Sequence, residues 1–224
     1  MARQVGTQIT GTFGNLIYYK FRGGYYIRQK PSSVRQTKGT KKAASIYGKA
    51  SAFAKQLRIY LEPLIPAPKS KALRDRLTPA VYPFLTEADL NYLNGFELHD
   101  PKGVGIRLTL QPVITREQDG TLSLRLPAFN PKTRLPGTSA TSQVRLSVMA
   151  AFLCQDPNDN MATEVHDLLI PYEDMLIGEQ TFILANDVPQ SCLVTVALRM
   201  QFLRKTGAAH DRKADLAWIA GCLN

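Results

Sequence analysis

Hydrophobic and polar residues alternate with a period of two along most of the chain beyond Gly103, which is the pattern of β-strands that bury one face. A turn between two of these segments contains Asp119 and Gly120, a pair typical of hairpins. The closing segment fits a helix or a strand, and a strand is favoured because it can pair with the segment before it. The alternating segments are 106–111, 121–129, 143–153, 164–172, 180–186, 192–203 and 214–223. They predict an antiparallel β-sandwich over residues 104–224.

The period changes to that of a helix between residues 40 and 61. Apolar residues recur there at steps of four, three, four and four, at Ile46, Ala50, Phe53, Leu57 and Leu61. This spacing predicts an amphipathic helix with one apolar stripe. Its polar positions carry several lysines and no Glu, so like charges repel without forming i,i+4 pairs. A solvated helix face is one interpretation, and the repulsion favours an external anion instead.

Residues 13–20 and 25–30 are rich in aromatic and β-branched residues, and FRGG between them supplies the positive-φ positions of a tight turn. They predict a β-hairpin that ends at Pro31, which has no N–H for a sheet ladder. A hairpin alone is marginally stable in water, so we expect it to pack on the apolar stripe of the helix. Residues 1–62 are therefore expected to form one basic hairpin–helix module.

The segment EPLIPAPKSK, residues 62–71, contains three prolines and cannot continue a helix. We place the end of the first module there. A short helix is expected at 70–78, and another after Thr86, whose hydroxyl would cap it ahead of acidic residues in the first turn. Gly95 is placed to end this second helix. Residues 63–103 are thus expected to be a proline-rich linker with short helices.

Charge is distributed very unevenly along the chain. The first 61 residues contain twelve Lys and Arg residues and no Asp or Glu. Residues 1–76 carry a net charge of +14, whereas residues 77–224 carry −4. Such an asymmetry is typical of a basic binding region joined to an ordinary domain, and it attracts polyanions.

Aromatic and basic residues are interleaved in the predicted hairpin. Cations bind phosphates and rings stack on bases, although aromatic residues are also common on ordinary strands. The candidates for polyanion binding are Lys20, Arg22, Arg28, Lys30, Arg35, Lys38, Lys41 and Lys42. The candidates for stacking are Tyr18, Tyr25 and Tyr26. We expect Tyr26 to face the partner with Arg28 and Lys30, Tyr25 to face the helix with Ile27, and residues 32–42 to form an arm that orders on the partner.

No motif for catalysis stands out. GKAS at 48–51 lacks the first glycine of a phosphate loop, and the three histidines are isolated from one another. We expect a non-enzymatic protein with no catalytic residue, no cofactor and no metal site. Cys154, Cys192 and Cys222 include no CxxC pair, which favours buried reduced thiols in a cytoplasmic protein. No secretory signal and no transmembrane helix is expected, and therefore no membrane partner.

The order GTFGNLIYYKFRGGYYIRQKP, VRQTKGT and KKAASIYGKASAFAKQLR resembles the opening of uncharacterised bacterial proteins that are grouped as domains of unknown function. The resemblance covers residues 11–60, and FLRKTGAAHDRKADLAWIAGCL resembles the closing strand pair of those proteins. It implies an α+β fold in which a basic hairpin–helix module precedes an antiparallel, immunoglobulin-like β-sandwich. It implies no activity, partner or binding residue.

These observations favour a protein that binds a polyanion, above all nucleic acid, with little sequence specificity. Composition alone does not separate DNA from RNA. The alternative is a structural or assembly subunit of a phage-like or other multi-subunit complex. Its hairpin would join the sheet edge of a homo- or hetero-oligomeric neighbour, and its basic arm would cross an acidic protein surface. A metal-dependent hydrolase that uses the acidic stretch 156–179 has the least support.

Overall fold

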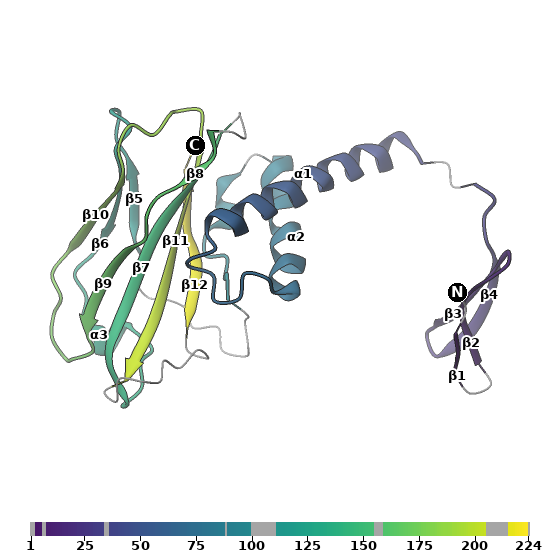
Figure 1. Ribbon diagram of the computed structural model, residues 1–224, viewed down its shortest axis with the longest axis horizontal. Helices are drawn as coiled ribbons and strands as arrows, with labels where there is room; N and C mark the ends of the chain where they lie inside the picture. Colours follow the sequence, from purple (N-terminus) through teal and green to yellow (C-terminus); the bar gives the residue numbers. More distant parts are fainter. Residues whose placement is uncertain are drawn as a thin grey trace. The chain divides into compact units, whose positions relative to one another are not determined.

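The strands form three antiparallel sheets, accompanied by three α-helices, in the part of the chain that the computed structural model describes (Figure 1). The described residues are 3–5, 8–33, 36–87, 89–99, 111–154, 159–204 and 215–223. The predicted α+β class with antiparallel sheets is therefore confirmed. The chain divides into two compact units, Met1–Ala43 and Ala44–Asn224.

The first unit contains a four-stranded meander. Its strands are β1 (Arg3–Val5), β2 (Gln8–Phe13), β3 (Leu16–Phe21) and β4 (Gly24–Gln29), paired in chain order. The predicted hairpin is the β3–β4 pair. Its two turn residues, Arg22 and Gly23, have φ values of +46° and +83°. Positive φ at both central positions matches the right-handed twist of the flanking strands, which is why the second of them is a glycine.

The second unit contains two sheets. The smaller has the order β10–β6–β5, from β5 (Val113–Arg116), β6 (Leu122–Leu126) and β10 (Gln180–Ala185). The larger has the order β12–β11–β7, after which β8 and β9 both pair with β7. Its strands are β7 (Thr141–Leu153), β8 (Met161–Ala162), β9 (His166–Pro171), β11 (Leu193–Arg204) and β12 (Leu216–Leu223). The closing segment is thus a strand, while the strand expected at 106–111 lies almost wholly outside the described residues.

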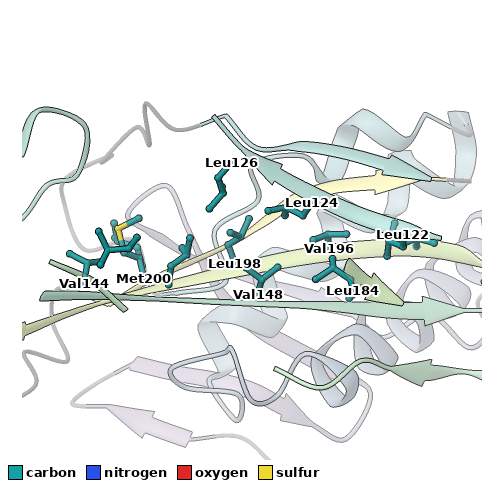
Figure 2. Close-up of a cluster of buried hydrophobic side chains, with 14 of the residues drawn as sticks. Leu122, Leu124, Leu126, Val144, Val148, Leu184, Val196, Leu198 and Met200 are labelled. Atoms are coloured by element: carbon teal, nitrogen blue, oxygen red, sulfur yellow. The ribbon is translucent and has the colours of Figure 1, made fainter. Parts of the chain in front are cut away.

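One hydrophobic cluster lies between these two sheets (Figure 2). Leu122, Leu124 and Leu126 of β6 supply one side of it. The larger sheet supplies the alternate residues of its two longest strands, namely Val144, Leu146, Val148, Ala150 and Phe152 of β7 and Val194, Val196, Leu198, Met200 and Phe202 of β11. These are the residues that the period of two assigned to one face, so that prediction is confirmed.

The opposite face of the larger sheet is also buried, under helices α1 (Lys38–Tyr60) and α2 (Lys71–Glu87). Ala50, Ala54 and Leu57 of α1 join a second cluster with Met149 of β7 and Ala197 of β11. The apolar stripe of the helix is therefore covered inside the second unit. This corrects the expectation that the stripe would be covered by the hairpin. The two compact units divide at residues 43/44, within α1.

The proline-rich segment after α1 is packed against the larger sheet. Leu64 and Ile65 are buried. The guanidinium of Arg199 on β11 donates to the Pro63 carbonyl (3.3 Å) and to Asp215 (2.7 Å), a carboxylate that is itself buried. Breaking a buried ion pair of this kind leaves an uncompensated charge and is costly. Leu64 and Ile65 of this segment therefore belong to the core of the second unit.

Helix α2 is longer than expected because it continues through Pro79 and Pro83. The two prolines are four residues apart and share one side of the helix, away from the buried Leu77 and Val81. The expected helix start at Thr86 is wrong. Its hydroxyl donates to carbonyls of the preceding turn and lies near the end of α2.

A short 3₁₀ helix (Leu90–Leu93) follows α2, and Asp89 caps it. Gly95 has φ +74° and ends it, as the sequence indicated. The next residues run along β12, with hydrogen bonds from Gly95 N–H to Ile219 O (2.8 Å) and from Leu98 N–H to Ala217 O (2.7 Å). This segment covers an edge that would otherwise be open to another strand.

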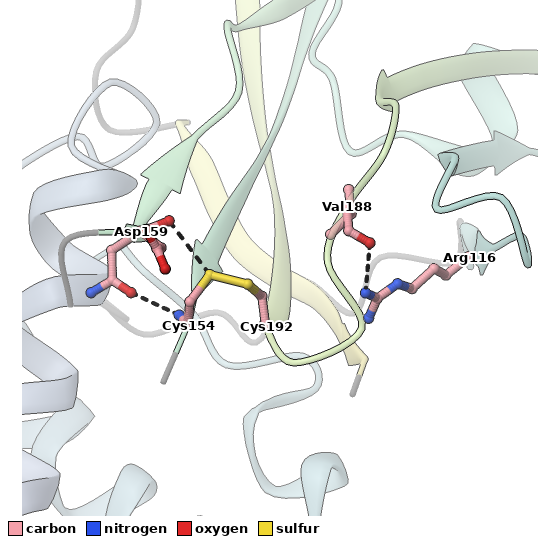
Figure 3. The surroundings of a disulfide bond; sticks show 6 residues. Arg116, Cys154, Asp159, Val188 and Cys192 are labelled. Atoms are coloured by element: carbon pink, nitrogen blue, oxygen red, sulfur yellow. Dashed lines mark hydrogen bonds between the residues drawn. A yellow bond between two sulfur atoms is a disulfide. The ribbon is translucent and has the colours of Figure 1, made fainter. Parts of the chain in front are cut away.

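Cys154 and Cys192 form a disulfide that joins the ends of β7 and β11 (Figure 3). The expectation of three reduced thiols is therefore wrong. Leu153 pairs with Leu193 in antiparallel strands, so Cys154, which follows the first, lies opposite Cys192, which precedes the second. Disulfides persist mainly in oxidising compartments. The cytoplasmic location that was inferred from reduced thiols loses that support. Within the described ranges, no helix is long and apolar enough to cross a membrane.

The helix stripe offers a direct test of this architecture. Leu57→Ala should lower the free energy of unfolding by about 2–5 kcal/mol, because Leu57 is fully buried and its truncation leaves a cavity. Lys55→Ala, on the exposed side of the same helix, should change it by less than about 0.5 kcal/mol. Denaturant titration of both variants measures the difference. Equal effects would show that the stripe is not part of the core.

Candidate nucleic-acid interface

The pairing register of the first unit divides its side chains between two faces. Tyr19 lies opposite Tyr26, and Ile17 opposite Arg28, so these four residues share one face. Tyr18 lies opposite Ile27, and Lys20 opposite Tyr25, which places them on the other face. The expected phase of β4 is therefore observed, with Tyr26 alongside Arg28 and Tyr25 alongside Ile27.

One face carries a continuous row of rings and guanidinium groups, which we call the aromatic ladder. Its members in spatial order are Arg28, Tyr19, Tyr26, Phe21 and Arg22. Arg28 lies 5.7 Å from the Tyr19 ring centroid, and Arg22 lies 5.3 Å from that of Phe21. The two tyrosine rings are stacked with centroids 5.8 Å apart, and Phe21 meets Tyr26 edge-on at 6.5 Å. The three rings are 38–55% exposed, so this row presents π-faces and cations to solvent.

Gly24 gives the Tyr26 ring its place in the ladder. A Cβ at this position would lie 2.9 Å from the ring of Tyr26, closer than a real Cβ contact. The ring therefore lies over the backbone of Gly24, next to Phe21 across the strand pair. Gly24, the first residue of β4, thus leaves room for the Tyr26 ring.

The opposite face is apolar. Its exposed or half-exposed apolar side chains are Ile9, Phe13, Leu16, Tyr18, Tyr25 and Ile27, and the exposed Gln29, opposite Leu16, shares the face. Lys20 lies 5.5 Å from the Tyr25 ring centroid and is the one described charge on this face. Tyr25 is 41% exposed, so the expectation that its ring packs into a core against the helix is wrong. The structure therefore separates Tyr18, Tyr25 and Lys20 from the other hairpin candidates.

The remaining basic candidates follow the sheet in the chain. Lys30 is exposed, just beyond β4, and Arg35 lies outside the described residues. Lys38, Lys41 and Lys42 lie in the first two turns of α1, after Thr37, which caps the helix by accepting from Thr40 N–H (3.1 Å). No acidic residue lies in that first turn. Lysines at the positive end of a helix dipole repel it, so this end of α1 favours an anion.

Sequence reasoning missed two members of the ladder, Tyr19 and Phe21. Both were visible in the hairpin as aromatic residues, but the three predicted stacking residues mixed the two faces. The signal that finds them is the register about the RGG turn. A two-residue turn at Arg22 and Gly23 places Phe21 opposite Gly24 and Tyr19 opposite Tyr26.

No group of three or more His, Cys, Asp or Glu residues that could hold a metal ion occurs in the described ranges. Cys222 is the free thiol, and it is buried. Burial raises the pKa of Cys222 to about 11, while a hydrogen bond with Thr195 opposes this rise. The thiol is therefore protonated and weakly nucleophilic at neutral pH.

Comparisons of the chain with models of known protein families, with curated proteins and with solved structures found no match. Functional inference therefore rests on the geometry of the chain itself.

The raised pKa of Cys222 predicts a specific dependence on pH. Below about pH 9 both folded and unfolded states keep the proton, and between pH 9 and about 11 the unfolded thiol loses it first. The contribution of Cys222 to stability should therefore fall over that range. The difference in unfolding free energy between the wild type and Cys222→Ala, followed across the range, measures it. A difference that stays constant would contradict the assigned burial of the thiol.

Proposed function

We propose that this protein is a non-enzymatic binder of single-stranded nucleic acid with low sequence specificity, and that the aromatic ladder is its binding surface. The observation that carries the proposal is three exposed rings in a row between two arginines on one sheet face. Bases of any sequence stack on such rings, and each stacked base contributes about 1–3 kcal/mol. The flanking guanidinium groups bind phosphates and stack on bases.

The charge of the first unit supports a polyanionic ligand. Residues 1–43 contain nine of the 28 Lys and Arg residues and none of the 18 Asp and Glu residues. No carboxylate within the unit can neutralise these cations, so their mutual repulsion is relieved by an external anion. Lys38, Lys41 and Lys42 at the start of α1 add to this field. Phosphate contacts of this kind position a nucleic acid without reading its sequence.

A second candidate function is that of a structural or assembly subunit. It is favoured by the outer edge of β4, which pairs with β3 alone among the described strands. An open edge can accept a strand from a neighbouring subunit, and the basic arm would then lie on an acidic protein surface. Salt dependence of binding separates this candidate from the first.

Two further predictions about the fold and its relatives accompany this proposed function. We propose that the two sheets of the second unit have an immunoglobulin-like arrangement. We also propose that the chain is related to the bacterial family that its hairpin resembles. The Cys154–Cys192 disulfide favours an oxidising compartment over the cytoplasmic location that the sequence predicts.

Removal of one ladder ring tests the stacking role. Tyr26→Ala should weaken binding of a short single-stranded oligonucleotide by about 1–3 kcal/mol. Its thermal stability should barely change, because the ring is largely exposed. The matched control is Tyr25→Ala, which removes a similarly exposed ring from the opposite face and should leave affinity unchanged. Equal losses in the two variants, measured by fluorescence anisotropy, would refute the ladder as the binding surface.

Salt dependence tests the electrostatic part. Each single-strand phosphate that is neutralised contributes about 0.7 to the slope of log affinity against log salt. Replacing Arg22, Arg28, Lys41 and Lys42 by Ala should therefore lower that slope by about two to three.

The matched control removes the same charge from exposed lysines of the second unit. It replaces Lys49, Lys55, Lys69 and Lys71 by Ala. This variant should keep the wild-type slope within about one. Binding that does not depend on salt in the wild type would instead favour the assembly candidate.

A further inference from the structure

The β-sheet sets the spacing of the rings in the aromatic ladder. The ring centroids of Tyr19 and Tyr26 lie 5.8 Å apart, and those of Tyr26 and Phe21 lie 6.5 Å apart. Successive bases that stack on one another in a nucleic-acid strand lie about 3.4 Å apart. Neighbouring rings of the ladder are therefore almost twice as far apart as stacked bases.

A base does not fit between the two stacked tyrosines of the ladder. Enclosing a base between two rings requires a separation of about 6.8 Å, which is twice the stacking distance. The centroids of Tyr19 and Tyr26 are only 5.8 Å apart and the ring planes are inclined by 29°, so the gap is too narrow. Tyr19 is nevertheless 38% exposed and Tyr26 48% exposed. Each ring therefore offers its own outer surface, and one ring stacks on one base.

Contacts on the sheet hold the rings at this spacing. The register pairs Tyr19 with Tyr26 and Phe21 with Gly24. A Cβ at Gly24 would lie 2.9 Å from the Tyr26 ring, so this ring lies against the backbone of β4. At one end of the ladder the Arg28 guanidinium lies 5.7 Å from the Tyr19 ring centroid. Because the rings are positioned by strand pairing, the ligand has to adapt its base spacing to that of the ladder.

A single strand matches the ladder only when its bases are separated from one another. The sugar–phosphate backbone has several rotatable bonds per nucleotide, so a single strand can extend in this way. The extension costs the free energy of stacking between neighbouring bases. This cost is larger for purines than for pyrimidines, because the two fused rings of a purine overlap more with the next base.

We infer that the aromatic ladder binds single strands whose bases are unstacked, one base to each ring, and that it therefore prefers pyrimidine runs to adenine runs. This inference rests on the proposed function and specifies its class of ligand. It concerns base composition and not the order of the bases, because stacking uses the face that all bases share. A preference of this kind is compatible with low sequence specificity, since stacking reads no base edge.

Double-stranded nucleic acid does not match the ladder. Its bases are held about 3.4 Å apart by stacking and pairing, and neighbouring bases cover their faces. Arg22 and Arg28, at the two ends of the ladder, can still bind its phosphates. Binding of a duplex should therefore depend on these cations and not on the three rings.

The affinities of the full-length protein for oligo(dT) and oligo(dA) of equal length, at one salt concentration, test the inference. The two probes carry the same charge, so the phosphate contacts contribute equally to both. Oligo(dT) should bind about tenfold more tightly, a difference of about 1.4 kcal/mol. Equal affinities, or tighter binding of oligo(dA), would overturn the inference and leave the proposed function standing. Binding of neither probe would refute the proposed function, and the inference with it.

The ultraviolet absorbance of the bases measures unstacking directly. Bases absorb more strongly when they are unstacked, so oligo(dA) should gain absorbance when it binds the wild-type protein. Tyr25→Ala, which removes a ring from the opposite face, should give the same gain, and Tyr26→Ala should give a smaller one. Oligo(dA) that is bound with unchanged absorbance keeps its bases stacked, and this result would contradict the inference. The wild-type measurement decides the question even if one of the variants fails to fold.

Discussion

Burial of the β7–β11 strand pair on both faces is the constraint on which the second unit depends. One face of the pair packs on β6 and β10, and the other packs on α1 and α2. A two-sided core explains why the strands carry small residues such as Ala151 and Ala197 on the helix face, where the helices approach closely. It also explains why the proline-rich segment is held in place, since it connects two helices that the same sheet must bury.

The first unit differs from the second in that the described side chains of its strands are exposed or half-exposed. Its strands are paired and its RGG turn has positive φ at both central positions, but none of residues 9–33 is buried. Its rings and cations are therefore available for contacts outside the chain. Its two faces differ in chemistry, since one carries the aromatic ladder and the other is mostly apolar.

Much of the second unit could be predicted because a period of two reports a buried face directly. The alternation in β7 and β11 identified the residues of the inter-sheet core. The period could not show that Met149 and Ala151, between those residues, are buried as well, because alternation identifies one buried face and does not say whether the other face meets a helix or solvent. The helix stripe was read correctly, but its partner was assigned to the nearest segment in sequence. Packing joins residues that are far apart in the chain, such as Leu57 and Ala197.

The sequence by itself determined the basic charge of the first 61 residues, the turn at RGG and the placing of Tyr25 and Tyr26 on opposite faces of the sheet. Charge and strand periodicity are local properties, so they can be read from the sequence alone. Tertiary structure decided what locality cannot. It placed Cys154 opposite Cys192 and put the boundary between the units within α1. These outcomes depend on the register between β7 and β11 and on the burial of α1 against the larger sheet. Both bring together segments that are far apart in the chain.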